Sequence, residues 1–145
     1  YYFDFLEFRS NHTKGMTPST PVIPLIHALN YTLKKIMDEG VPNRHKRHDQ
    51  LNQLVHQWVK SKGFELLPKP EFASKSLTCV RNNLNIDVGG FVKTLREEKK
   101  ISIDGGYGKI KGKTFRISNM GDETVDSINH LISNMDEVLS SFLPA

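Results

Sequence analysis

Apolar side chains recur at helical spacing in four stretches of the chain, and these stretches predict four helices. Thr20 followed by Pro21 is a helix start, because threonine caps free backbone amides and proline fits the first helical position. Gly40 is expected to end that helix, while Asp87 and Asp122 are expected to cap the third and fourth helices. The predicted helices run from Pro21 to about Glu39, from about Pro42 to Lys62, from Val88 to about Glu98, and from Glu123 to about Phe142.

Short apolar stretches of alternating pattern lie between the helices and predict strands. They are Phe64–Leu67, Ser76–Arg81, Ile101–Ile103 and Thr114–Ile117. The last two strands flank the glycine-rich stretch Gly105–Gly112, which predicts a wide hairpin loop. Strands joined by a hairpin and separated by helices favour an antiparallel or mixed sheet. We therefore expect one α+β domain, a two-layer sandwich whose small, mostly antiparallel sheet is covered on one face by helices.

The composition indicates a globular chain with a hydrophobic core. Its 145 residues are 37% hydrophobic and 25% charged, which suits a single domain. The apolar runs are only a few residues long, too short for a helix that spans a bilayer. The single cysteine, Cys79, excludes an internal disulfide and a cysteine-based zinc cluster, and it suits a reducing compartment. The formal charge of +4 and the pI near 9.2 favour an anionic partner without choosing among phosphate, carboxylate and nucleic acid.

Three candidate motifs each have a simpler structural explanation. The stretch Gly105–Gly112 could cradle a phosphate, but it matches neither the dinucleotide fingerprint nor the P-loop spacing, so a hairpin loop is favoured. The basic run Arg44–His48 could contact nucleic acid, yet a solvated helix end or an anchor for a neighbouring carboxylate is favoured. The six histidines show no spacing typical of a metal site, so no metal is expected.

Arg116 is the residue on which the functional interpretation depends. It lies between Phe115 and Ile117, so a strand that buries those two side chains directs the guanidinium to the opposite face. A guanidinium held on a strand can bind a carboxylate through two parallel hydrogen bonds, whereas the alternative is a solvated arginine. The helix start near Thr17 and Thr20 offers free amides that suit a phosphate, and simple capping is the alternative there.

Several stretches resemble the C-terminal part of class V aminotransferases, the pyridoxal-phosphate enzymes of fold type I. The resemblance is to the alanine–glyoxylate and serine–pyruvate group, and it covers nearly the whole chain. Its most specific part is Ile101–Gly121, because the glycine loop, KGK, FRI and MG occur there in the family's order and spacing. Tyr1–Phe5 and Lys14–Pro21 resemble the family's link from the large domain, and Arg44–His48 resembles its basic helix start.

The resemblance implies transaminase chemistry and assigns residues to it. Arg116 matches the arginine that grips the α-carboxylate of the substrate. Thr20 matches a threonine that reaches the phosphate of pyridoxal 5′-phosphate in the neighbouring subunit, and Thr17 lies where a tyrosine or threonine does the same. The resemblance implies a parent enzyme that is a cytoplasmic homodimer and transfers an amino group from alanine or serine to glyoxylate or pyruvate. Neither nucleic acid nor a membrane is expected as a partner.

One departure from the family concerns the cofactor lysine. In the family this lysine lies upstream of the position of Tyr1, and no lysine of this chain stands in the matching context. The chain begins with Tyr1 rather than methionine, and we expect residues 1–20 to be a link from an absent large domain and residues 21–145 to be the small domain. The chain alone is then expected to bind no pyridoxal 5′-phosphate and to be inactive as a transaminase.

Two other functions stay open on the sequence alone. A basic α+β module could bind nucleic acid through Arg44–Arg47 and Lys109–Lys113, and its binding would depend on salt. A stand-alone regulatory domain could bind a small carboxylate or an amino acid. The coding sequence upstream of Tyr1 would separate a stand-alone module from an aminotransferase.

Overall fold

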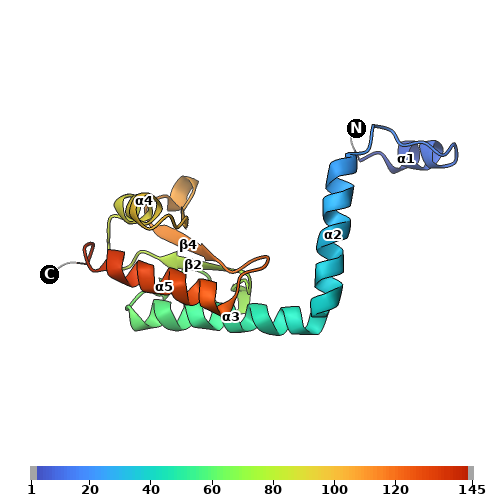
Figure 1. The fold of residues 1–145 in the computed structure, drawn as a ribbon. Coiled ribbons are helices and arrows are strands. Elements are labelled where there is room, and N and C mark those ends of the chain that lie inside the picture. Colours follow the sequence, from blue (N-terminus) through green and yellow to red (C-terminus); the bar gives the residue numbers. More distant parts are fainter. Residues whose placement is uncertain (1–2, 144–145) are drawn as a thin grey trace. The chain divides into compact units, whose positions relative to one another are not determined.

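The computed structural model of the chain describes residues 3–143. The chain divides into two compact units, Tyr1–Val41 and Pro42–Ala145, here named unit 1 and unit 2. Residues 1–2 of the predicted link and residues 144–145 of the predicted small domain lie outside the described residues. Within the described residues, five α-helices and a four-stranded antiparallel sheet packed against helices make the chain α+β, as the sequence predicts (Figure 1).

Unit 1 consists of two helices, α1 (Phe5–His12) and α2 (Ile23–Glu39). Asp4 caps α1, because its carboxylate accepts hydrogen bonds from two backbone amides of the first turn. As predicted, α2 ends at Gly40, whose φ of +80° lies in the region that favours glycine.

The start of α2 differs from the sequence prediction. The helix begins at Ile23, its N-cap residue is Val22, and no side chain caps it. The predicted cap at Thr20 is therefore wrong. A helix starting at Pro21 would place Pro24 where the first intrahelical hydrogen bond needs a backbone N–H, which proline lacks. A start at Ile23 puts Pro24 in the first turn, where that donor is not required.

Helix α2 carries an apolar stripe that stays exposed. None of its residues is buried, although its pattern is strongly amphipathic. The exposed apolar side chains of α2 include Ile23, Leu25, Ile26, Leu29, Leu33 and Met37. No helix within residues 3–143 combines the length and the apolar character needed to cross a membrane.

Three further helices follow, with bounds close to the predicted ones: α3 (Val41–Ser61), α4 (Val88–Glu98) and α5 (Val125–Leu139). Asp87 is the N-cap residue of α4, as predicted, but its side chain makes no capping hydrogen bond. The cap of α5 is Thr124 rather than the predicted Asp122. Thr124 and Ser127 each accept a hydrogen bond from the other's backbone amide, which forms a reciprocal capping box. The Asp122 carboxylate instead lies 3.7 Å from Arg44 Nη1.

The sheet has the strand order β1-β2-β4-β3, and every neighbouring pair is antiparallel. The strands are β1 (Glu65–Leu66), β2 (Leu77–Arg81), β3 (Asp104–Gly105) and β4 (Thr114–Ser118). Two short 3-10 turns, η1 (Pro70–Phe72) and η2 (Gly108–Ile110), lie in the loops. The pairs that join β2 to β4 run along both strands, so these two strands form the centre of the sheet.

The predicted strand at Ile101–Ile103 is wrong, because pairing with β4 begins only at Asp104. The Ile101 amide donates a hydrogen bond to Leu95 O at 3.1 Å, and Lys100 before it has a φ of +58°. This is the backbone geometry that ends a helix, so Ile101 completes α4 instead of entering the sheet.

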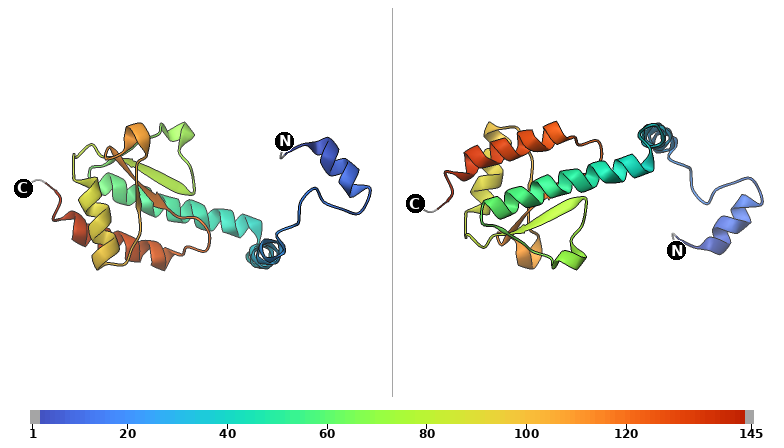
Figure 2. Two further views of the ribbon diagram at one scale, coloured as in Figure 1. Left: turned by 90° about the horizontal axis from the view of Figure 1, so that it is seen from above. Right: turned by 90° about the horizontal axis from the view of Figure 1, so that it is seen from below.

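One face of the sheet is buried against the helices of unit 2 (Figure 1, Figure 2). Val80 of β2 and Phe115 and Ile117 of β4 are completely buried on that face. The Phe115 ring makes edge-on contacts with Trp58 of α3 and Phe91 of α4, with ring centroids 6.4 and 5.7 Å apart. The predicted two-layer arrangement is confirmed, and the alternate residues of β2 and β4 are left for the opposite face.

Candidate functional site

The hairpin between β3 and β4 determines the geometry of the candidate site. The Gly106 amide donates to Thr114 O at 3.1 Å and extends the pairing beyond β3. A Cβ at Gly106 would lie 2.2 Å from Ile110 O and 2.4 Å from Thr114 Oγ1, so the loop can close this tightly only around glycine. The stretch Gly105–Gly112 therefore forms the predicted hairpin loop.

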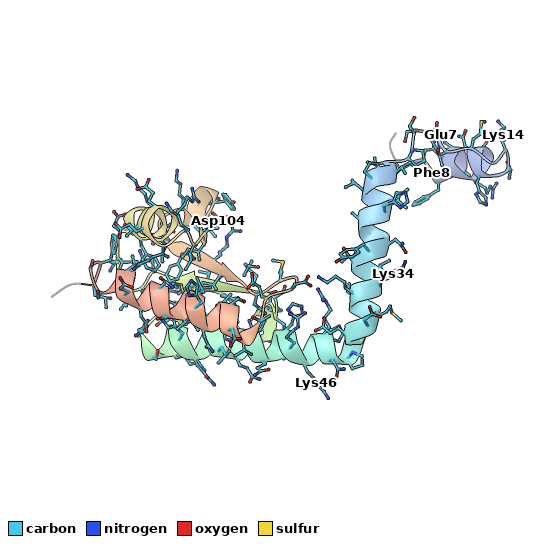
Figure 3. The ribbon with its side chains drawn as sticks, in the orientation of Figure 1. Glu7, Phe8, Lys14, Lys34, Lys46 and Asp104 are labelled. Atoms are coloured by element: carbon cyan, nitrogen blue, oxygen red, sulfur yellow. The ribbon has the colours of Figure 1, made fainter. Side chains whose placement is uncertain are left out.

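The pairing register places Asp104 directly opposite Arg116. Arg116 Nη2 donates a hydrogen bond to Asp104 Oδ2, and the two side chains form an ion pair. The Tyr107 hydroxyl donates to the same oxygen at 2.6 Å, and the Tyr107 ring centroid lies 4.4 Å from Arg116 Cζ. Three side chains of one hairpin thus hold one another, with Asp104 projecting beside β4 (Figure 3).

Arg116 lies on the face of the sheet opposite the buried Phe115 and Ile117, as the alternation of residues predicts. Its side chain is 24% exposed. Its Nε is buried and makes no hydrogen bond with any described residue. Because a guanidinium has five N–H donors, the bond to Asp104 leaves donors for a further acceptor.

The hairpin stabilises the charged forms of both partners. The hydrogen bond from Tyr107, followed by the charge of Arg116, holds the pKa of Asp104 below its usual 3.8. Desolvation on its own lowers the pKa of Arg116, but the contacts with Tyr107 and Asp104 outweigh it, so this pKa is raised. Both groups are therefore ionised at neutral pH. Their contribution to stability is present above pH 3.8 and is lost as the pH falls through the lowered pKa of Asp104.

A cavity of about 740 Å³ opens beside Arg116. Its lining comes from the hairpin, the end of β4, and helices α4 and α5, and it includes Asp104, Arg96, Ser127 and His130. Two arginines and several hydroxyl or imidazole groups line this cavity together with the carboxylates of Asp104 and Glu123, and apolar side chains complete its wall. A carboxylate that enters it can meet Arg116 with charge-assisted hydrogen bonds.

Thr17 and Thr20 belong to unit 1, whereas Arg116 belongs to unit 2, so neither unit contains all three predicted site residues. Thr17 Oγ1 donates to Ser19 O at 2.7 Å. Thr20 is exposed and precedes α2 without capping it. The two hydroxyls are accessible, but unit 1 does not assemble them into a phosphate site by capping a helix.

The basic run at the start of α3 anchors the segment that leads from β4 to α5. Arg44 Nη2 donates to Gly121 O at 3.0 Å, and Arg47 donates to the backbone oxygens of Gly121 and Glu123. His48 Nδ1 donates to Asn119 O at 2.8 Å. The Arg44–Asp122 contact confirms the predicted anchor for a neighbouring carboxylate, whereas the other bonds are to backbone oxygens. They also occupy two arginines that a nucleic-acid surface would need.

Lys46, in the same run, behaves differently from its neighbours. It is exposed and projects from α3 away from the sheet (Figure 3). The run therefore combines an internal anchor with a solvated side chain, which are the two interpretations that the sequence favoured.

Sequence reasoning missed Asp104 and Tyr107. Their spacing on either side of Gly105 and Gly106 offered a signal, because residues that flank a glycine turn often face a strand partner. The length of the loop hid which residue of β4 that partner would be. No group of three or more histidine, cysteine, aspartate or glutamate side chains that could hold a metal ion occurs within residues 3–143.

No protein-family model matches the chain. Among curated proteins, an uncharacterised aminotransferase of Methanocaldococcus jannaschii is 33% identical over 122 residues, which cover 83% of this chain and 32% of that protein. A serine–glyoxylate aminotransferase of Methylorubrum extorquens is 29% identical over 122 residues, covering 83% of this chain and 30% of that protein. The chain thus spans about a third of the length of these curated relatives.

Solved structures show the same partial correspondence. The crystal structure of an alanine–glyoxylate aminotransferase from Nostoc sp. aligns with a TM-score of 0.77 at 29% identity, over 83% of this chain and 32% of that one. The ureidoglycine–glyoxylate aminotransferase of Bacillus subtilis aligns with a TM-score of 0.82 over 99% of this chain and 38% of that one. Its identity is 22%, so this second likeness concerns the fold alone.

Proposed function

We propose that this chain, which is homologous to class V aminotransferases of the serine–glyoxylate and alanine–glyoxylate group, is the small C-terminal domain of such an enzyme. In this proposal residues 1–20 are the link from the large domain and residues 21–145 are the small domain. The parent enzyme transfers an amino group from alanine or serine to glyoxylate or pyruvate, and it works in the cytoplasm.

The observation that carries the proposal is the Arg116 guanidinium, held at the wall of a cavity of about 740 Å³. Its Nη2 is bonded to Asp104 and a guanidinium has five N–H donors, so the cation is positioned and can still bind a further acceptor. We assign to Arg116 the binding of the substrate α-carboxylate. A fixed carboxylate orients the rest of a small amino acid, which is how this domain contributes to catalysis.

The cofactor of the homologous family, pyridoxal 5′-phosphate, supplies an electron sink when it is bound. Within the described residues of this chain, the groups that suit its phosphate are the exposed hydroxyls of Thr17 and Thr20. They fit only as contributions to a site that other residues complete. We therefore propose that both threonines reach the phosphate bound in a neighbouring subunit and that the chain alone is inactive.

The proposed partners are the large domain and a second subunit in a homodimer. The exposed apolar stripe of α2 supports a partner, because a row of large aliphatic side chains at helical spacing is stabilised by burial. The proposed small-molecule partners are the amino-acid and 2-oxo-acid substrates.

The test is Arg116→Ala in the full-length protein that contains this chain. We expect the KM for the amino donor to rise roughly 10- to 100-fold, because charge-assisted hydrogen bonds to the carboxylate are lost. Arg81→Ala is the matched control: Arg81 lies on the neighbouring strand and pairs with Glu65 at 3.5 Å, outside the cavity lining. Normal KM and kcat for Arg116→Ala would refute the assignment.

The same cavity supports a second candidate, a regulatory module that binds a small carboxylate. The full-length protein separates the two. An aminotransferase shows the visible absorption of bound pyridoxal 5′-phosphate, and this absorption changes when an amino acid is added. A regulatory module binds the carboxylate without that spectrum.

A further inference from the structure

We propose that Asp104 is a built-in competitor for the substrate carboxylate on Arg116, so that the affinity of the site is set by an exchange of one carboxylate for another. This inference rests on the proposed role of Arg116. In this inference Asp104 and Tyr107 set the affinity for the substrate. Neither the glycine loop nor Arg116 has that role by itself.

The contacts of the hairpin favour an exchange of carboxylates on Arg116 over a purely structural role for Asp104. Asp104 Oδ2 accepts from Arg116 Nη2, so the side chain already occupies one donor of the proposed binding group. Asp104 lines the same cavity as Arg116 and is 54% exposed, so its carboxylate has room to move away. An arriving carboxylate would meet Asp104 as a like charge at short range, which opposes binding while Asp104 stays in place.

Tyr107 gives Asp104 a second partner during the exchange. Its hydroxyl donates to Asp104 Oδ2 at 2.6 Å, and this bond does not depend on Arg116. Its ring lies over the guanidinium, so the arginine keeps one contact when Asp104 leaves. Tyr107 therefore lowers the cost of separating Asp104 from Arg116.

The incoming ligand gains a bond that Asp104 does not make. Arg116 Nε is buried and unbonded within the described residues, and a buried donor without an acceptor is unfavourable. Because Nε is buried, a ligand carboxylate reaches Nε–H only after the side chains that cover it move aside. With two oxygens it then takes Nε–H together with a terminal N–H of the fork. This extra bond is what lets a substrate displace a carboxylate that is already attached to the chain.

The first test compares KM values in the full-length enzyme. Asp104→Asn keeps the size of the side chain and removes its charge, so we expect the KM for the 2-oxo acid to fall roughly 3- to 10-fold with kcat nearly unchanged. Tyr107→Phe keeps the ring and removes the hydroxyl, so we expect a KM roughly two- to threefold higher. Because Tyr107 acts through Asp104, Tyr107→Phe should have no effect in the Asp104→Asn background.

The outcomes separate this inference from the proposed function. A KM that is unchanged or raised in Asp104→Asn overturns the competition, since Asp104 would then be inert or would only position the arginine. Arg116→Ala reports on the proposed function independently, because it removes the binding group itself. Glu97→Gln is the control for net charge: Glu97 is exposed on α4 and lies outside the cavity lining.

The second test observes Arg116 directly, without turnover. The Nε–H of Arg116 gives its own resonance in a ¹H–¹⁵N NMR spectrum of the 145-residue chain, identified by its loss in Arg116→Lys. Titration with pyruvate should shift this resonance, with a midpoint roughly 3- to 10-fold lower in Asp104→Asn than in the wild type. Equal midpoints, or no shift in either protein, would overturn the exchange at this group.

Discussion

Helices α2 and α3 carry the same kind of amphipathic pattern but differ in what surrounds them. In unit 2, α3 buries its apolar side chains Leu51, Val55, Trp58 and Val59 in the core. In unit 1, α2 has the more apolar sequence and buries none of its residues. An apolar stripe therefore indicates that a helix requires a packing partner, whereas the surrounding fold determines whether that partner is present.

Polar groups show the same contrast between the two units. In unit 2 the side chains of Arg44, Arg47 and His48 bond to a distant segment, and Arg116 bonds to Asp104 across a strand pair. In unit 1 the hydroxyl of Thr17 bonds two residues away, to Ser19. These polar contacts of unit 2 therefore join distant segments, whereas the Thr17 contact of unit 1 is local. Substitutions in the two units should then differ in cost.

The largest expected difference comes from one substitution made in each unit. Leu51→Ala removes a side chain with no exposed surface and should lower the free energy of unfolding of unit 2 by about 2–5 kcal/mol. Leu29→Ala removes a side chain that is 58% exposed and should change the free energy of unfolding of unit 1, to which it belongs, by less than about 0.5 kcal/mol. Denaturant titration followed by far-ultraviolet circular dichroism measures both effects, because helices of both units contribute to that signal. Equal effects would show that the two units do not differ as described.

Two adjacent glycines provide a sharper comparison within the hairpin. Gly106→Ala would place a Cβ 2.2 Å from Ile110 O and should destabilise unit 2 by about 1–3 kcal/mol through overpacking. Gly105→Ala meets no atom within 4 Å, so it should be close to neutral. The same denaturant titration applies. Equal destabilisation by the two substitutions would contradict the close packing of the loop around Gly106.

The smallest expected effect concerns the start of α5. Thr124→Ala removes one half of the capping box and should cost about 1 kcal/mol. Asp122→Asn, at the position where the sequence predicted the cap, should cost less, because the Asp122 side chain is 61% exposed and lies 3.7 Å from Arg44. Thermal unfolding of the two variants measures which one loses more stability. A larger loss in Asp122→Asn than in Thr124→Ala would indicate that Asp122 is the cap.

Local sequence determined most of the secondary structure of this protein. Apolar periodicity placed α3, α4 and α5 and the central strands, because each pattern reports which face of an element is buried. Alternation in β4 also placed Arg116 opposite Phe115 and Ile117, which is a property of any strand. The resemblance that identified the family rested on residues that are neighbours in the sequence.

Tertiary structure decided the remaining features, because they depend on residues that are distant in the chain or on competition between adjacent groups. Asp104 became the partner of Arg116 through the pairing register, which the loop length did not reveal. Ile101 ended α4 instead of opening a strand, and Thr124 rather than Asp122 capped α5, because the backbone amides had more than one available acceptor. Sequence alone thus predicted a guanidinium on a sheet face, whereas the fold decided which carboxylate it already holds.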